Sequence, residues 1–157
     1  MTVKHIKADA IEYTLAEEDR TLIHVCNNKG VMGSGIALSV RRDIPAAYKA
    51  YIRSDIFDMG SICGDPFYRC INMIAQDSYR GYQGNFESKR YLNYGALAEC
   101  LDEISRNAWA LDDAGKTEIV LPFKMGADRA GGDWEIVLEM VIYFLGDDFD
   151  ITVCQLP

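Results

Sequence analysis

The sequence has four prolines and only two histidines in 157 residues, and no low-complexity stretch or obvious linker interrupts it. Because nothing in this composition marks a boundary, we predict one domain over residues 1–157, and 49% hydrophobic content suffices for a buried core. No apolar run approaches the length that spans a bilayer, and none near residue 1 is typical of a signal peptide. We therefore expect a cytoplasmic protein without a membrane partner.

The cysteines are few and do not form a recognisable pattern. Their number is odd, no C-x-x-C spacing occurs, and their neighbours are apolar, at Cys26, Cys63, Cys70, Cys100 and Cys154. A disulfide framework or a zinc site would need paired or regularly spaced cysteines. We predict that they are small core residues, with no metal and no cofactor.

Basic residues are also in deficit, since 16 Lys and Arg stand against 24 Asp and Glu and the net charge is −8. Binding of an extended nucleic acid relies on basic surface, so this composition argues against such a partner. The pairs Arg41-Arg42 and Lys89-Arg90 have acidic neighbours and are typical of solvated helix faces. An acidic protein can still bind a small anion through backbone N–H groups and helix N-termini. We expect a small-molecule ligand and a monomer.

Glycines are plentiful at one place, where Gly30, Gly33 and Gly35 separate an apolar run from a helix-like run. The preceding segment 21–26 predicts a strand that ends next to Asn27, and residues 35–53 predict a helix interrupted near Pro45. Glycines permit close backbone approach to a ligand, and the helix start offers unpaired N–H groups. The spacing matches neither the dinucleotide fingerprint nor the P-loop. The block indicates a nucleotide-like pocket of another kind, with Asn27 placed to bind ribose hydroxyls.

A second strand, glycine loop and helix follow at residues 118–122, 123–132 and 133–141, with Asp133 as the predicted N-cap. Two such units in a small α/β domain place both loops at the carboxyl edge of one sheet, where such sheets bind ligands. One loop can hold a sugar and the other a diphosphate.

The remaining segments complete a mixed sheet with helices on its faces. Strands are predicted at 3–7, continuing after a bend through 12–14, and at 151–155, and a hairpin at 61–63 and 67–75 around an Asp-Pro turn. An exposed loop is predicted at 79–87, followed by a helix within 91–111.

Five segments, in order, resemble those of macrodomains, the ADP-ribose-binding α/β fold. They cover nearly the whole chain: residues 6–11, 27–37, 72–76, 94–97 and 121–134. The pattern is most similar to the branch that contains the yeast ADP-ribose 1″-phosphate phosphatase and the terminal ADP-ribose protein glycohydrolases, a pattern shared by many phage and bacterial proteins. The resemblance implies a three-layer α/β/α fold with a mixed central sheet and helices on both faces.

The resemblance also implies the residues of a ligand site. Asp9 matches the acidic residue that hydrogen-bonds the adenine amino group, although a loop aspartate that caps a turn is the alternative interpretation. The residues predicted to bind ADP-ribose are Asp9, Ala10, Asn27, Gly30, Met32, Gly33, Ser34, Gly35, Ile36, Gly126, Ala127, Asp128, Arg129, Ala130 and Gly131.

Three residues are predicted to be catalytic: His24, Asn27 and Asp128. His24 corresponds to a histidine of the yeast phosphatase and could transfer a proton near neutral pH, but a hydrogen-bonded core histidine is an equal alternative. Asp128 stands where related proteins often have a second glycine, and either turns away from a diphosphate or acts at the distal ribose. Arg129 could offset its charge or contact a phosphate.

The resemblance to the glycohydrolases fails at two positions. An ungapped match places Ala130 opposite their catalytic aspartate, although a small shift of the loop would place Asp128 there. Gln76 stands where they have the catalytic lysine, whose covalent adduct an amide cannot form. The predicted function is therefore binding of ADP-ribose or a close derivative with hydrolysis of the 1″-phosphate of ADP-ribose 1″-phosphate. The alternatives are a non-catalytic module that binds ADP-ribose or another NAD derivative and, less favoured, a de-ADP-ribosylating glycohydrolase.

Overall fold

A computed structural model describes residues 3–55 and 58–157. Its strands are β1 (Val3–Lys7), β2 (Arg20–Asn27), β3 (Ile62–Gly64), β4 (Cys70–Gln76), β5 (Glu118–Pro122) and β6 (Asp150–Gln155). Its α-helices are α1 (Ala10–Ala16), α2 (Gly35–Asp43), α3 (Pro45–Arg53), α4 (Tyr94–Arg106), α5 (Ala108–Asp113) and α6 (Trp134–Leu145), and a 3₁₀ turn, η1, covers Tyr82–Gly84.

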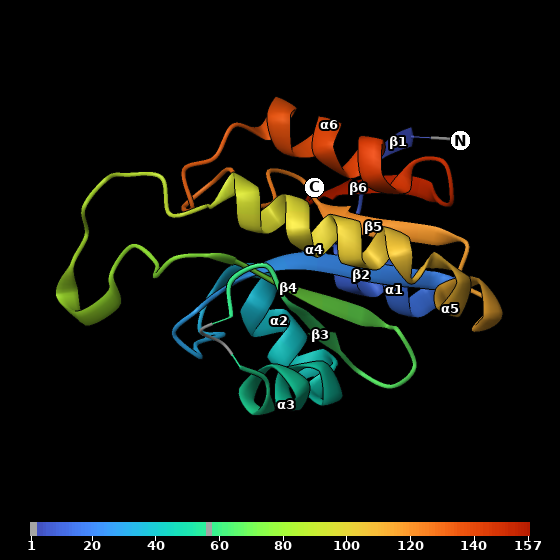
Figure 1. Ribbon diagram of the computed structural model, residues 1–157, viewed down its shortest axis with the longest axis horizontal. Helices are drawn as coiled ribbons and strands as arrows, with labels where there is room; N and C mark the ends of the chain where they lie inside the picture. The colour runs from blue at the N-terminus through green and yellow to red at the C-terminus, as the bar shows by residue number, and fades with distance from the viewer. Residues whose placement is uncertain (1–2, 56–57) are drawn as a thin grey trace.

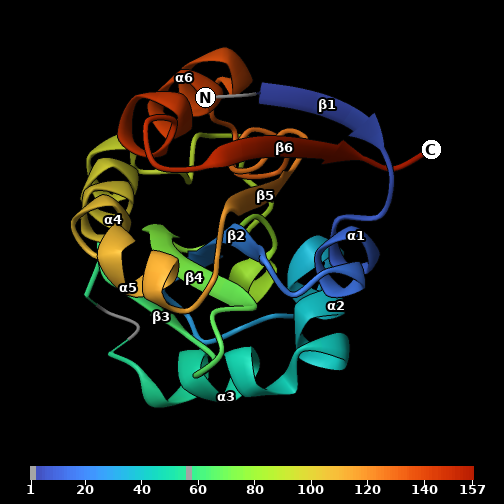
Figure 2. The same cartoon turned by 90° about the vertical axis from the view of Figure 1, so that its right-hand side faces the viewer.

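The strands form one sheet in the order β1-β6-β5-β2-β4-β3. Every neighbouring pair is parallel except β3 and β4, which form an antiparallel hairpin. Figures 1 and 2 show α4, α5 and α6 on one side of this sheet and α1, α2 and α3 on the other. The predicted mixed sheet with helices on both faces, in three layers, is confirmed.

Both faces of the sheet are buried, as near-continuous apolar strands predict for parallel sheets. In β4, Ile71, Met73 and Ala75 pack toward α4 and α6, because alternate side chains of a strand point to opposite faces. Cys70 and Ile74 belong to the other cluster, which lies under α1, α2 and α3. Burying two apolar faces fixes the register of the strands and so the positions of their ends.

Side-chain caps begin three of the helices. Asp9 accepts a hydrogen bond from the Glu12 N–H, Asn93 caps α4 and Asp133 caps α6, as predicted for Asp133. The strand continuation predicted for 12–14 is wrong, because the Asp9 cap turns these residues into α1. The predicted helix within 91–111 is two helices, which meet at Asn107.

The predicted hairpin is confirmed, but its turn is longer than expected. Asp65, which is buried, accepts hydrogen bonds from the N–H groups of Phe67 and Cys70, and Tyr68 takes a left-handed conformation with φ of 55°. Residues 67–69 therefore belong to the turn, and β4 begins at Cys70.

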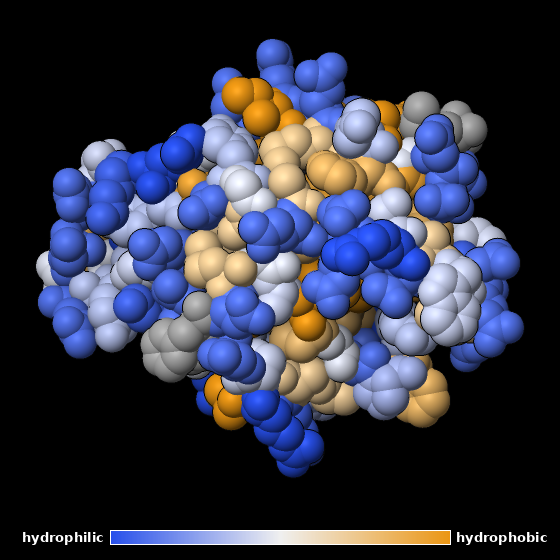
Figure 3. Space-filling model, in the orientation of Figure 1, coloured by the Kyte–Doolittle hydropathy of each residue, from blue (hydrophilic) through white to orange (hydrophobic). Residues whose placement is uncertain are grey.

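A long loop joins β4 to α4 and projects from the body of the protein (Figure 1). Its tip is η1, in the region 79–87 that was predicted to be exposed, and Figure 3 shows mostly hydrophilic residues over this projection. Within the described ranges, none of the helices has both the length and the apolar character needed to cross a membrane.

Candidate functional site

A cleft of about 940 Å³ lies along the carboxyl edge of the sheet. Its walls come from the ends of five parallel strands, from the start of α2 and from the loop that follows β5. The side chains and backbone that line it include Asp9, Asn27, Ser34, Gly35, Gln76, Tyr79, Arg80, Phe123, Lys124, Asp128, Arg129, Ala130 and Leu156. Both glycine loops thus meet at one edge, as predicted.

The strand order gives the cleft two distinct ends. Asp9 follows β1 at one end, and Gln76, Tyr79 and Arg80 follow β4 at the other. Between β1 and β4 lie four interstrand spacings of about 4.8 Å, or about 19 Å in all. The cleft can therefore take an elongated ligand of dinucleotide size, with its two ends on different strands.

A hydrogen-bonded clamp shapes the first loop. Tyr51, which is fully buried on α3, places its hydroxyl 2.7 Å from the carbonyl oxygen and 3.0 Å from the Oδ1 atom of Asn27. The same hydroxyl accepts a hydrogen bond from the Gly30 N–H at 3.0 Å. Asn27 Nδ2 donates to the Val31 carbonyl, and Oδ1 accepts from the Lys29 N–H. Asn27 is thus a scaffold of its own loop, with one amide N–H left over for a ligand.

The start of α2 offers unpaired donors to the cleft. Ser34 is the N-cap residue, but its hydroxyl caps nothing, and the N–H groups of Gly35, Ile36 and Ala37 have no acceptor in the described part of the chain. These three residues line the cleft. Free N–H groups at the positive end of a nine-residue helix form a site suited to an anion.

The second loop is folded tightly onto itself. A Cβ atom on Gly132 would lie 2.5 Å from the Gly126 carbonyl oxygen, and the Gly132 N–H donates to that oxygen at 3.0 Å. Ala130 is buried, and its carbonyl accepts from the N–H groups of Tyr91 and Leu92. Asp128 and Arg129 are left exposed at the turn, and Arg129 lies 3.5 Å from the Ser34 hydroxyl across the cleft.

The charge of the cleft differs from that of the whole protein. The chain carries a net charge of −8, yet three cationic side chains line the cleft, Lys124, Arg129 and Arg80, against two carboxylates, Asp9 and Asp128. This local excess of positive charge, added to the α2 N-terminus, favours an anionic ligand.

Comparisons with solved structures give the fold a family name. The chain superposes on the macrodomain of Thermus aquaticus DarG with a TM-score of 0.69 and 20% identity over 97% of each chain. It superposes on a macrodomain protein from Streptomyces coelicolor with a TM-score of 0.71 and 23% identity, again over 97% of each. The chain has the macrodomain fold.

Two further relatives extend the comparison. Thermosipho africanus DarTG, solved in complex with ADP-ribose, matches 99% of this chain with 42% of its own chain, at 15% identity and a TM-score of 0.67. A 17.5 kDa protein in the tk-vs intergenic region of Enterobacteria phage T4, described as uncharacterized, is 28% identical over 144 residues, 87% of this chain and 86% of its own. No protein-family model matches the sequence.

Most residues predicted to bind the ligand line the cleft, but four do not. Met32 is buried in the core beneath α2 and α3, and Gly30 serves the Tyr51 clamp. Ala127 and Gly131 shape the second loop without facing the cleft. These four positions shape or support the two loops.

The prediction that His24 is catalytic is contradicted by its position. Because residues 22, 24 and 26 share one face of β2, His24 points under α3, where it is fully buried and outside the cleft. Its Nε2 lies 2.6 Å from Asn72 Oδ1, and Asn72 Nδ2 donates to the Ala47 carbonyl of α3. An amide oxygen only accepts, so the proton is on Nε2. The alternative interpretation, a hydrogen-bonded core histidine, is confirmed.

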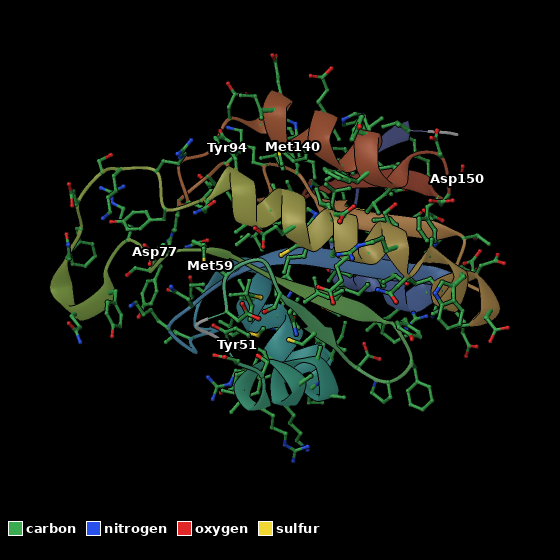
Figure 4. All side chains as sticks on the ribbon, viewed as in Figure 1. Tyr51, Met59, Asp77, Tyr94, Met140 and Asp150 are labelled. Carbon is green, nitrogen blue, oxygen red and sulfur yellow. The ribbon has the colours of Figure 1, made fainter. Side chains whose placement is uncertain are left out.

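Two further aspartates, Asp77 and Asp133, and the exposed Tyr143 lie outside the cleft. Asp77 lies where the chain leaves β4 (Figure 4), and it accepts from Asn28 Nδ2 outside the cleft. Asp133 is occupied as the α6 cap. Tyr143 is 80% exposed on α6 and lines no part of the cleft, whereas Phe123, at the end of β5, does.

The cysteines are core residues as predicted, except that Cys63 is only partly buried. All five thiols are free. Burial raises the pKa of Cys26 and of Cys70, so both stay protonated and unreactive. Among residues 3–55 and 58–157, no group of three or more His, Cys, Asp or Glu side chains is arranged to hold a metal ion.

Sequence reasoning missed Tyr51 and Arg80. Tyr51 contacts Asn27 across 24 positions, and the amphipathic pattern of its helix indicates only a core residue. Arg80 lies in a loop whose path the sequence does not specify.

The buried His24 makes stability depend on pH. Burial lowers its pKa to about 4 from an ordinary 6.5, so the unfolded chain binds more protons than the folded chain between these values. The free energy of unfolding should fall as pH drops from 6.5 toward 4, by about 2 kcal/mol from this group at pH 5. Urea unfolding of the wild type and of His24→Gln at pH 7 and pH 5 measures the difference. An equal loss in both proteins contradicts the assignment.

Tyr51→Phe tests the clamp of the first loop. Loss of the hydroxyl leaves the Gly30 N–H without its acceptor and the Asn27 carbonyl without its donor, which should lower the free energy of unfolding by about 1 to 3 kcal/mol. Burial raises the pKa of Tyr51, so the hydroxyl is a donor at every pH where the protein is studied. Tyr48→Phe is the matched control and should cost less than about 0.5 kcal/mol, because Tyr48 is a half-buried tyrosine of the same helix, beneath Arg41, whose hydroxyl has no hydrogen-bond partner in the described part of the chain. Equal losses would show that the clamp contributes nothing.

Proposed function

We propose that this macrodomain binds ADP-ribose or a close derivative and hydrolyses the 1″-phosphate of ADP-ribose 1″-phosphate. One observation carries the proposal: an anion site at the α2 N-terminus lies between an acceptor carboxylate at one end of the cleft and a group of ionisable side chains toward the other. ADP-ribose has a matching order of parts, with adenine at one end, a diphosphate in the middle and the distal ribose at the other end.

Asp9 supports the adenine end. Its Oδ1 caps α1, while Oδ2 has no partner in the part of the chain that the structure describes. A free carboxylate oxygen beside the cleft is a strong acceptor for the exocyclic amine of adenine. Capping and adenine recognition are therefore compatible functions of one side chain.

The centre of the cleft supports the diphosphate. Unpaired N–H groups at the start of α2 face the loop after β5, where the Asp128, Arg129 and Ala130 N–H groups also have no acceptor among the described residues. Such backbone donors bind phosphates without basic side chains. Arg129, adjacent to Ser34 across the cleft, adds a charge-assisted contact.

Asp128 is our candidate general base. It and Asp9 are the two carboxylates that line the cleft among the described residues, and Asp9 belongs to the other end. In the proposed step, Asp128 accepts a proton from water, the water oxygen bonds to phosphorus, the bond from phosphorus to the ribose oxygen breaks, and Asp128 returns the proton to that oxygen. The products are ADP-ribose and inorganic phosphate, and the remaining amide N–H of Asn27 positions the distal ribose.

A non-catalytic ADP-ribose-binding module is the second candidate, favoured by the withdrawal of His24 into the core. Glycohydrolase activity has less support. Gln76 and Ala130 line the cleft where the glycohydrolases are expected to have their lysine and aspartate, and neither side chain can form an adduct or transfer a proton.

Adenine recognition is tested by calorimetric titration with ADP-ribose. Asp9→Asn keeps the capping oxygen but loses the second carboxylate oxygen, so we expect about tenfold weaker binding, in line with the loss of one hydrogen bond to a charged group. Asp133→Asn is the matched control, because it also replaces an N-cap aspartate but lies outside the cleft. If the wild type fails to bind ADP-ribose, the proposed function is wrong at its first step.

Catalysis is tested by release of inorganic phosphate from ADP-ribose 1″-phosphate. Asp128→Asn should lower kcat by at least about 100-fold, the usual contribution of a general base, while ADP-ribose still binds. His24→Gln should leave the rate within about twofold, since the ring lies in the core. A wild type that binds ADP-ribose and releases no phosphate would favour the non-catalytic module.

A further inference from the structure

Arg80 lines the cleft beyond the end of β4, which is separated by three strands from β1, the strand that Asp9 follows. It follows β4 in the long loop and lines the cleft together with Gln76 and Tyr79. A ligand whose adenine contacts Asp9, on the β1 side, must extend along the strand ends toward β4. The group attached to its distal ribose then arrives next to Arg80.

One hydrogen bond within the loop fixes the guanidinium of Arg80 through its Nε atom. Its Nε donates to the Phe86 carbonyl at 3.2 Å, and the Gly81 N–H donates to the Asn85 carbonyl, which closes the loop behind it. Tyr79 packs edge-on against Tyr82 with ring centroids 5.5 Å apart. The two terminal nitrogens of Arg80 have no acceptor in the described part of the chain and remain available to an anion.

Three arginines of this acidic protein are paired with carboxylates, whereas Arg80 has no such partner in the part of the chain that the structure describes. Arg20, Arg42 and Arg106 each form an ion pair with a carboxylate. Arg41 and Arg90 lie over tyrosine rings. An arginine without a carboxylate partner within the described ranges, at the rim of an anion-binding cleft, fits recognition of a ligand phosphate, because its planar fork matches phosphate oxygens in a bidentate manner.

We propose that Arg80 determines specificity by binding the phosphomonoester on the distal ribose, so that it selects ADP-ribose 1″-phosphate over ADP-ribose. This inference rests on the proposed function. It assigns separate phosphates to the two arginines of the cleft: Arg129, near the α2 N-terminus, contacts the diphosphate common to both ligands, and Arg80 contacts the terminal phosphate that only one of them carries.

The test compares the affinities of both ligands across three variants. Titrations are made in the Asp128→Asn background, with a phosphate assay in parallel to establish that the ligand is intact; where it is consumed, KM from initial rates replaces Kd. Arg80→Gln should weaken binding of ADP-ribose 1″-phosphate about tenfold and change ADP-ribose binding less than twofold. Arg129→Gln should weaken both ligands alike. Arg106→Gln, at the end of α4, is the matched control and should change neither.

A salt titration and the variant Arg80→Lys test whether the preference depends on the charge and on the shape of the Arg80 side chain. The preference for the phosphorylated ligand should shrink as NaCl rises from 20 to 300 mM, because Arg80 is exposed and its charge is screened. Arg80→Lys should recover part of this preference, since the lysine keeps the positive charge but lacks the planar guanidinium that contacts two phosphate oxygens. The inference is overturned if Arg80→Gln weakens both ligands equally or neither. A wild type that binds neither ligand overturns the proposed function as well, so the two failures are distinguishable.

Discussion

Five parallel strands end at one edge of a sheet that is buried on both faces, and the cleft depends on this constraint. Two apolar faces leave no freedom for a strand to slip by one residue, because a slip would exchange its two sets of side chains. The ends of β1, β2, β4, β5 and β6 are thereby fixed relative to one another. Polar side chains just beyond those ends acquire defined separations without any direct contact between them.

The same constraint explains how an acidic protein can offer an anion site. Helices that begin at the edge of the sheet direct their unpaired N–H groups into the cleft, and a folded loop adds more of them. Backbone N–H groups carry no net charge, so they bind an anion without changing the charge of the rest of the protein. The surface can therefore stay strongly acidic while a confined region attracts phosphate.

Strands and helix caps could be predicted from the sequence where they depend on the residues within and next to each element. Alternation and apolar runs predicted β1, β2, β4, β5 and β6, and Asp133 was recognised as a cap from the residues around it. Residues 12–14 were assigned wrongly because a short buried helix and a strand have similar apolar content, and only the Asp9 cap decides between them. Most of the loop residues next to the glycines line the cleft, since the strand ends position them.

Contacts between distant segments could not be predicted in this way. His24 precedes Asn27 by three positions, but side chains alternate between the two faces of a strand, so His24 points into the core. Its structural role is evident only from its hydrogen bond with Asn72. The Tyr51 clamp joins a helix to a loop that the sequence does not bring together. Arg80 lines the cleft because it lies just beyond the end of β4, in a loop whose path depends on glycines and ring contacts rather than on periodicity.

The position of Asp128 shows how closely the charges in such a cleft must be balanced. At an effective dielectric constant of about 20, a carboxylate about 5 Å from a phosphate charge is repelled by about 3 kcal/mol. The α2 N-terminus contributes about 1 to 2 kcal/mol of attraction to an anion, which by itself does not offset that repulsion. Arg129, the next residue in the chain and exposed on the same turn, supplies the missing positive charge. In the proposed function, the guanidinium of Arg129 offsets the repulsion between Asp128 and the phosphate, so Asp128 can accept a proton there without preventing the ligand from binding.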